Sequence, residues 1–145
     1  MNPSVTHPLL RDDHTSAWLG LEVVRADYGD VVVRAELREE MLNGHGIAHG
    51  GMLFAIADSA FALACNDPAG DGSTLTVASG VDVNFLRPAH RGEVIEASAR
   101  AVSVGRSGVY DVTVTAQGAD DPEPVVVALF RGRSRTIPAK APAAS

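Results

Sequence analysis

The segment from Gly50 to Cys65 places the strongest constraint on how this chain can fold. Its 16 residues, GGMLFAIADSAFALAC, are apolar or small except for one ionisable side chain, Asp58. The segment does not alternate between apolar and polar residues, is rich in helix formers, and is followed by Pro68 and Gly70. Because apolar residues occur around its whole circumference, we expect a helix that is buried on nearly all sides.

Segments with strand character lie on both sides of this helix. Two precede it and four follow it, at residues 21–26, 30–37, 73–86, 92–105, 106–116 and 123–135. Residues 94–101 alternate, so that the apolar residues Ile95, Ala97 and Ala99 share one face. Short connections imply antiparallel pairing. The order predicts an α+β domain in which a curved antiparallel sheet of five to six strands wraps around one long helix.

Length and composition fit one globular domain. With 145 residues, 46% of them hydrophobic, we expect a single domain over 1–145, with a core at about 15–137. The net charge of −6 argues against nucleic-acid binding. The apolar segment would span about 24 Å as a helix, too little for a hydrocarbon core of about 30 Å. One cysteine and no signal-peptide pattern predict a cytoplasmic protein.

A carboxylate at Asp58, inside an apolar helix, has two explanations. Burial raises the pKa of a carboxyl group and makes it a stronger base, which suits catalysis if the group stays ionised. Alternatively, Asp58 is structural, and its oxygens accept hydrogen bonds from strand backbone or pair with an arginine. The residues by themselves leave both explanations open.

Four stretches carry a resemblance to a known family. They are NGHGIAHGGMLFAIADSAFALACN at 43–66, VDVNFLRPA at 81–89, GRSGVYDVTV at 105–114 and VALFRGRSR at 127–135. Together, and in this order, they resemble the hotdog-fold thioesterases, in particular the phenylacetic-acid-degradation branch. The resemblance implies the hotdog fold and hydrolysis of aryl-acyl-CoA esters, such as hydroxyphenylacetyl-CoA, to the free acid and CoA.

The resemblance also implies roles for individual residues. Asp58 would be the general base or nucleophile, the N–H of Gly50 would polarise the thioester carbonyl, and Asn43 would orient the attacking group. It implies no metal and no cofactor, because CoA is part of the substrate.

A hydroxyl on the strand after the helix assists in many members of this family. Strict alternation would put Ser79 on the helix-facing side together with Val77 and Val81, whereas Thr76 would face the other way. We therefore predict Ser79 for this role.

The spacing of Gly50 and Asp58 adds a condition. They are 8 residues apart, which is about 12 Å along one helix. One carbonyl cannot reach both groups of the same chain, so Asp58 must come from a neighbouring subunit. The spacing therefore predicts a homodimer as the smallest active unit, and the resemblance implies that dimers pair into a homotetramer.

Basic residues are the candidates for contacts with the CoA phosphates. Arg87, Arg106 and Arg131 are the predicted contacts, and Arg133 and Arg135 share a strand face with Arg131. His49 is a further predicted substrate-binding residue, and it is also expected to cap the helix or hold the loop before it. Its i, i+4 spacing from His45 matches the HExxH zinc pair, but the acid of that motif is missing, so we predict no metal site.

Two other functions compete with hydrolysis. A hotdog hydratase or dehydratase would need a histidine–acid pair, and the helix contains no histidine. A non-catalytic acyl-CoA-binding module or sensor would give Asp58 no role. Release of CoA from a substrate, measured with and without the Asp58 carboxylate, distinguishes all three.

Overall fold

The computed structural model describes residues 5–140 of the 145-residue chain. In chain order its elements are η1 (Pro8–Leu10), α1 (His14–Leu19), β1 (Glu22–Asp27), β2 (Asp30–Glu36), η2 (Glu39–Met41), α2 (Gly50–Cys65), β3 (Thr74–Phe85), β4 (Val94–Ser103), β5 (Ser107–Gln117) and β6 (Val125–Pro138). The long helix and all six strands lie where the sequence predicted them, and the two 3-10 turns were not predicted. None of the helices within residues 5–140 is long and apolar enough to cross a membrane.

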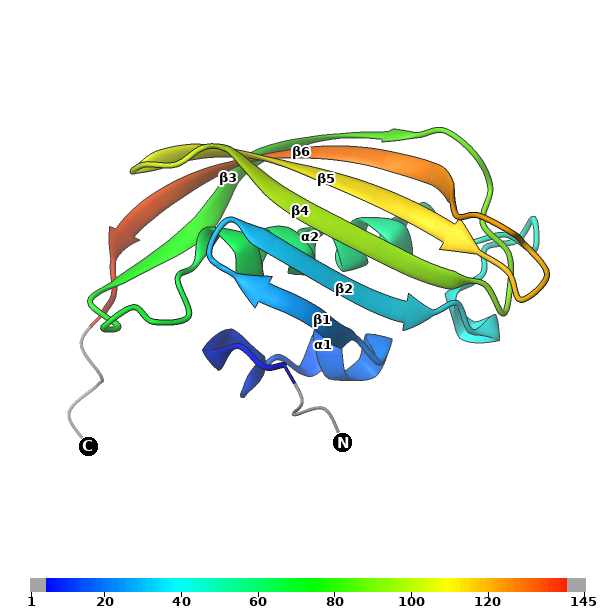
Figure 1. The fold of residues 1–145 in the computed structure, drawn as a ribbon, viewed down its shortest axis with the longest axis horizontal. Coiled ribbons are helices and arrows are strands. Elements are labelled where there is room, and N and C mark those ends of the chain that lie inside the picture. Colours follow the sequence, from blue (N-terminus) through cyan, green and yellow to red (C-terminus); the bar gives the residue numbers. More distant parts are fainter. Residues whose placement is uncertain (1–4, 141–145) are drawn as a thin grey trace.

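The six strands form one antiparallel sheet in the order β1-β2-β4-β5-β6-β3. The sheet is curved, and α2 lies against its concave face (Figure 1). After α2 the chain enters the sheet at the far edge as β3, and then returns to place β4 beside β2. This architecture confirms the predicted α+β fold with one central helix.

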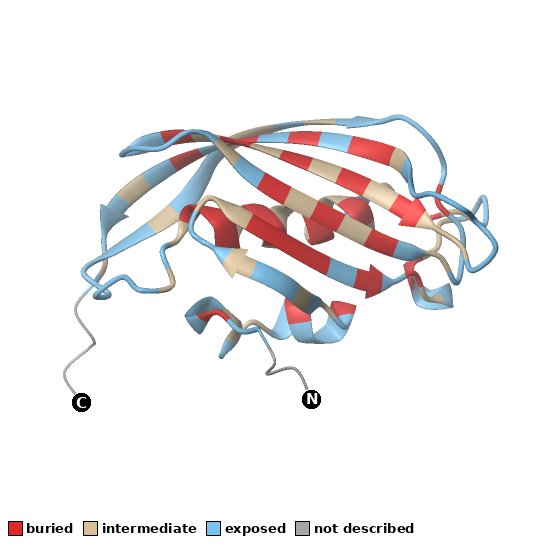
Figure 2. Cartoon of the chain, in the orientation of Figure 1, coloured by how far each residue is buried: buried red, intermediate tan, exposed pale blue. Residues whose placement is uncertain are grey.

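The core lies between α2 and the inward-facing residues of the sheet. Figure 2 shows buried and more exposed residues alternating along β4 and β5, where Ile95, Ala97, Val112 and Val114 are buried. On the helix, the buried residues are Leu53, Ile56, Ala57, Ala60, Phe61, Leu63, Ala64 and Cys65. Side chains of alternate strand residues and of most helix positions therefore share one apolar core.

Gly132 shows which side of β6 faces the helix. The ring of Phe61 on α2 packs edge-on against Tyr110, with centroids 5.5 Å apart, and against Phe130 at 5.9 Å. A Cβ atom on Gly132 would lie 2.5 Å from this ring. Glycine at this position therefore lets the sheet approach the helix closely, and the even-numbered residues of β6 from Ala128 onward face α2.

A β-bulge in β3 overturns the predicted face assignment. The register pairs Ala78 with Ser134 and Gly80 with Arg133, which leaves Ser79 as the extra residue. The alternation of β3 therefore changes at this point. Thr76 faces α2, because its Oγ1 lies 2.8 Å from Oγ1 of Thr136 on the helix-facing side of β6.

After the bulge, the prediction for the strand holds. Val81 and Val83 pack against the core, and Phe85 lies against the first residue of α2. Before the bulge, the face prediction was wrong. We expected Val77 to face the helix and Thr76 to face away, but Val77 lies on the outer face, opposite Arg135, and Thr76 faces the helix. An inserted residue shifts a strand with period two from one face to the other.

One face of α2 is only half-buried by the sheet. Its residues are Phe54, Ala55, Asp58, Ser59 and Ala62. The short helix α1 docks beside this face through Ser16, whose Oγ donates to Asp13 at 2.6 Å and lies 3.5 Å from Oγ of Ser59. The face that contains Asp58 is thus the least covered part of the helix.

Candidate active site

The loop before α2 is held together by Asn43. Its side-chain Oδ1 accepts hydrogen bonds from the backbone N–H groups of His45 (2.9 Å) and Ile47 (3.3 Å). Gly46, with φ +78°, makes the turn that this loop needs. Because Oδ1 is occupied, the Asn43 amide is oriented with its Nδ2 donor group free of partners among residues 5–140.

The start of α2 offers an unused backbone donor. His49 is the N-cap, and its Nδ1 accepts from the N–H of Gly51 at 3.0 Å. The N–H of Gly50 makes no hydrogen bond within the described chain. The first N–H groups of a helix lack intrahelical acceptors and lie at the positive end of the helix dipole. Gly50 can therefore donate to a ligand carbonyl, and His49 has the capping role predicted for it.

A cavity of about 440 Å³ brings these groups together. Asn43 and Gly50 line it, together with Leu53 and the segment Phe85–Ala89 at the end of β3. A Cβ on Gly50 would lie 3.1 Å from the Phe85 ring. Glycine therefore keeps the space beside this N–H open for a small group.

Asp58 lies elsewhere on α2 and has no partner. Its carboxylate makes no hydrogen bond and no ion pair with any residue from 5 to 140. The side chain is half-buried, and this desolvation raises the pKa of Asp58 above its usual value. A structural aspartate would have backbone donors or an arginine beside it, so within the described chain the geometry favours the catalytic explanation.

The two groups are separated as the spacing predicted. Gly50 and Asp58 belong to the same helix, at a separation of about 12 Å. Asp58 does not line the cavity that holds Gly50 and Asn43. One chain thus carries two candidate half-sites: an unused backbone donor at the helix start, and an unpartnered carboxylate in the helix middle.

Neither half contains Ser79. Its Oγ donates to the backbone carbonyl of Arg133 at 3.1 Å, and the residue is exposed. The hydroxyl on the helix-facing side of β3 is that of Thr76. The signal that could have revealed this is Gly80, because an isolated glycine inside a strand pattern often marks a bulge.

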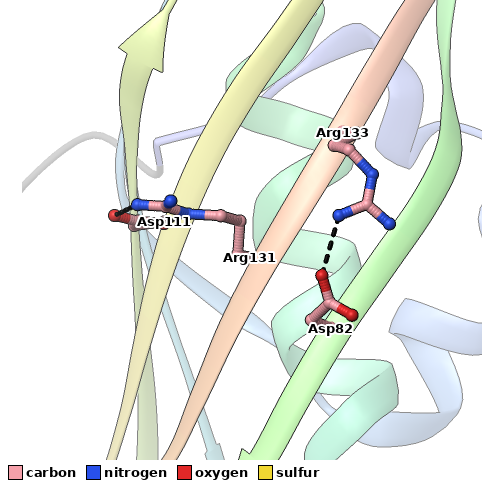
Figure 3. Close-up of polar contacts among 4 residues, drawn as sticks. All are labelled: Asp82, Asp111, Arg131 and Arg133. Atoms are coloured by element: carbon pink, nitrogen blue, oxygen red, sulfur yellow. Dashed lines mark hydrogen bonds and ion pairs between the residues drawn. The ribbon is translucent and has the colours of Figure 1, made fainter.

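The predicted arginines occupy different positions. Arg87 lines the Gly50 cavity, and its Nη1 donates to the carbonyl of Val126 at 3.1 Å. Arg131 lies on the outer face of the sheet, where it makes two hydrogen bonds to Asp111 (2.6 and 2.8 Å) and holds the pKa of that carboxyl below its usual range. Arg133 pairs with Asp82 on the same face (Figure 3).

The remaining predicted contacts are not brought to the cavity. Arg106 lies in the turn between β4 and β5, and its side chain makes no ion pair with a described residue.

Among residues 5–140 no three His, Cys, Asp or Glu side chains are grouped to hold a metal ion. Cys65 is buried, which raises its pKa to about 12.

Comparison with known families gives the class of protein. The sequence model of the thioesterase superfamily matches residues 45–122, which contain the Gly50 and Asp58 positions and the strands β3, β4 and β5. The chain belongs to the thioesterase superfamily.

Particular relatives agree with this assignment. The chain is 38% identical over 132 residues to the acyl-coenzyme A thioesterase PaaI of Escherichia coli K12, covering 90% of this chain and 88% of PaaI. The solved structure of E. coli PaaI, from the phenylacetic acid degradation operon, matches with a TM-score of 0.79 over 89% of this chain and 88% of PaaI.

Two further solved structures are similar. The TT0310 protein of Thermus thermophilus is 39% identical, with a TM-score of 0.73 over 84% of this chain and 96% of that one. The smu.793 protein of Streptococcus mutans UA159, solved bound to acetyl CoA, is 26% identical, with a TM-score of 0.71 over 83% and 91%. These matches support the resemblance read from the sequence and the hotdog fold.

Proposed function

We propose that this protein hydrolyses acyl-CoA thioesters, with arylacetyl groups such as phenylacetyl and hydroxyphenylacetyl as the preferred acyl part, in the catabolism of aromatic acids. The observation that carries the proposal is the unpartnered, half-buried carboxylate of Asp58 on the same helix as the unused N–H of Gly50. The similarity to E. coli PaaI, an acyl-coenzyme A thioesterase, supports the choice of substrate.

The chemistry assigns one task to each group. The N–H of Gly50 binds the thioester oxygen and stabilises the negative charge that develops there. Asp58 either removes a proton from the attacking water or attacks the carbonyl carbon itself. In both routes the C–S bond breaks, CoA leaves as its thiol after it takes up a proton, and one water supplies the oxygen and protons of the products. The Asn43 amide, oriented by its loop, can hold the attacking group.

A dimer completes the site. The separation within one helix requires that Asp58 of one subunit meets Gly50 and Asn43 of another. β3 is an edge strand whose apolar residues Leu75, Val77 and Phe85 are exposed, so its free backbone groups and side chains suit pairing with a second copy. We take a homodimer as the smallest active unit, and a homotetramer as two such dimers.

The residues around the Gly50 cavity are the candidates for contacts with the CoA part of the substrate. Arg87 and the exposed His49 lie at the Gly50 half and are the proposed contacts with the phosphate-bearing part of CoA. Arg131 is already paired with Asp111, which makes it the weaker of the predicted candidates, and Arg106 remains available. We propose no metal or cofactor for the reaction. A cytoplasmic location fits the single free thiol of Cys65.

The test measures CoA release from 3-hydroxyphenylacetyl-CoA by the wild type, Asp58→Asn and a matched control, Asp120→Asn, whose side chain lies in the exposed β5–β6 loop. We expect kcat to fall on the order of a hundredfold or more in Asp58→Asn, with the oligomeric state unchanged and the control equal to wild type. Unchanged turnover in Asp58→Asn would refute the mechanism. Binding of the ester without CoA release by the wild type would instead support the non-catalytic acyl-CoA-binding alternative.

A further inference from the structure

A second cavity, of about 270 Å³, lies at the other end of α2 from Gly50. The end of α2, the start of β3 and the N-terminal segment line it, together with the loop at residues 66–72, which contains the carboxylates Asp67 and Asp71. Cys65 and Leu75 line it with apolar surface, and the hydroxyls of Thr76 and Thr136 line it with polar surface. The two threonines come from the helix-facing side of the sheet.

The N-terminal segment is held in place as a wall of this cavity. His7 is 3% exposed, and its Nε2 lies 2.8 Å from the backbone carbonyl of Asn66, which directly follows α2. Pro8 and Leu9, next along the chain, line the cavity. This wall precedes residues 45–122, so it lies outside the part of the chain that matches the family model.

Asp58 lies along the helix from this cavity. Asp58 and Cys65 are seven residues apart and therefore share a face of α2, about 10.5 Å from one another along the axis. Between them on that face is Ala62, whose small side chain leaves room beside the helix. Burial raises the pKa of Cys65, and the nearby charge of Asp58 raises it further.

The proposed dimer places this cavity next to the other half of the site. β3 runs from the second cavity, at Thr74–Thr76, to the Gly50 cavity, at Phe85. When two copies of an edge strand pair in antiparallel fashion, the start of one lies beside the end of the other. The second cavity of one chain then adjoins the Gly50 cavity of its partner, and Asp58 of the first chain lies between them.

The lining of the cavity selects a kind of ligand. An apolar cavity of about 150 Å³ binds benzene, so 270 Å³ holds one aromatic ring with a small substituent. The hydroxyls of Thr76 and Thr136 are hydrogen-bonded to one another and to no other described residue. In such a pair one hydroxyl donates to the other, so the accepting hydroxyl keeps its own proton for a ligand.

We propose that this cavity binds the distal end of the acyl group, that it is sized for a single ring, and that the Thr76–Thr136 hydroxyl pair recognises a polar substituent on that ring. The inference rests on the proposed function and adds to it the residues that determine acyl specificity. Leu9 of the N-terminal segment closes this acyl-binding cavity, and the hydroxyl of Thr136 forms a hydrogen bond with the substituent on the ring.

The test compares kcat/KM for phenylacetyl-CoA, acetyl-CoA and whichever of 3- or 4-hydroxyphenylacetyl-CoA the wild type hydrolyses faster. Thr136→Val removes one hydroxyl at nearly constant shape. It should lower the preference for the hydroxylated over the plain ring by roughly three- to tenfold, the worth of one hydrogen bond. Leu9→Trp fills the cavity and should lower the phenylacetyl-to-acetyl ratio by about tenfold or more. Thr113→Val, on β5 opposite Leu129 of the outer face, is the matched control and should change neither ratio.

The outcomes separate the two proposals. If the wild type releases no CoA from any ester, the proposed function fails. If it hydrolyses them but Thr136→Val and Leu9→Trp leave both ratios unchanged, the acyl site is elsewhere and only this inference is overturned. If Leu9→Trp does not fold, the ratio measured for Thr136→Val still decides the matter.

Discussion

The two edges of the sheet differ in length and in exposed apolar surface. β1 has 6 residues, contains an irregularity between Val23 and Arg25, and has its Arg25 side chain in an ion pair with Asp30. β3 has 12 residues and exposes Val77, at 42%, and Phe85, at 52%. Both edge strands contain an irregularity, at Val23–Arg25 in β1 and at Ser79 in β3, so the difference lies in length and exposed apolar surface. Short, charged edges resist pairing with other chains, whereas long apolar edges invite it.

The candidate functional cavities lie along the β3 edge of the sheet. The cavity of Gly50 adjoins the end of β3, the second cavity adjoins its start, and no predicted site residue lies on β1. We propose that one edge ends the sheet, while the other joins two chains and completes their active sites. Substitutions at the two edges and in the half-sites test that distinction.

The largest effect should come from removing the backbone N–H of Gly50, which lies next to Phe85 at the end of β3. Gly50→Pro removes the N–H but keeps the helix, because proline is tolerated at the first helical position and the extended backbone of His49, ψ 130°, suits a following proline. We expect kcat to fall roughly 10²-fold.

Gly50→Ala is the matched control for this substitution. It adds the same Cβ next to Phe85 and retains the N–H, so its loss should be clearly smaller. Equal losses in the two variants, measured by CoA release, would mean that crowding against Phe85 and not the missing donor causes the defect.

A charge placed on each edge gives the next largest effect. Val77→Glu on β3 should shift the protein from dimer towards monomer and lower activity about tenfold or more, because a charge on an apolar edge strand opposes pairing. Val24→Glu on β1, where Val24 is 38% exposed, should leave the oligomeric state and activity as they are. Size-exclusion chromatography with light scattering, combined with the CoA assay, measures both. A monomeric but fully active Val77→Glu variant contradicts the account.

The smallest effect concerns stability and its dependence on pH. Because desolvation raises the pKa of Asp58 in the folded state, the unfolded chain releases this proton at lower pH. Ionisation therefore costs the folded protein stability as pH rises from the unfolded value through the raised pKa. Asp58→Asn should match wild type in Tm near pH 3.5 and exceed it modestly at pH 7.

Asp111 provides the opposite case for the same measurement. Its pKa is lowered by Arg131, so its carboxylate stabilises the fold above its unfolded pKa and loses that contribution as pH falls through the lowered value. Asp111→Asn should lower Tm slightly at pH 7. If Asp58→Asn also lowers Tm at pH 7, then the carboxylate has a structural partner and its proposed role is weakened.

Much of the fold was readable from the sequence because its signals are local. The apolar segment gave α2 its bounds, Gly50–Cys65, and the alternation at Ile95, Ala97 and Ala99 placed the inner face of β4. The separation of Gly50 and Asp58 followed from helix geometry alone. Each of these inferences needs only the neighbouring residues in the chain.

The errors arose where one strand meets another. Strict alternation predicted the wrong face for Ser79, because the bulge depends on how β3 pairs with β6. Thr76, and not Ser79, therefore faces the helix. The partners of Arg131 could not be read from its own strand, since Asp111 belongs to β5. The cavity formed by residues 7–9, Cys65 and Thr136 joins three distant parts of the chain and left no local pattern.

The most direct test of the central claim is complementation between two inactive variants. Asp58→Asn and Gly50→Pro carry different affinity tags, are produced together, and the mixed oligomers are isolated through both tags. A mixed dimer contains one site with both defects and one with neither, so it should regain roughly half of the wild-type kcat. Activity no higher than that of the two parent variants would show that each chain builds its site alone, and would contradict the account.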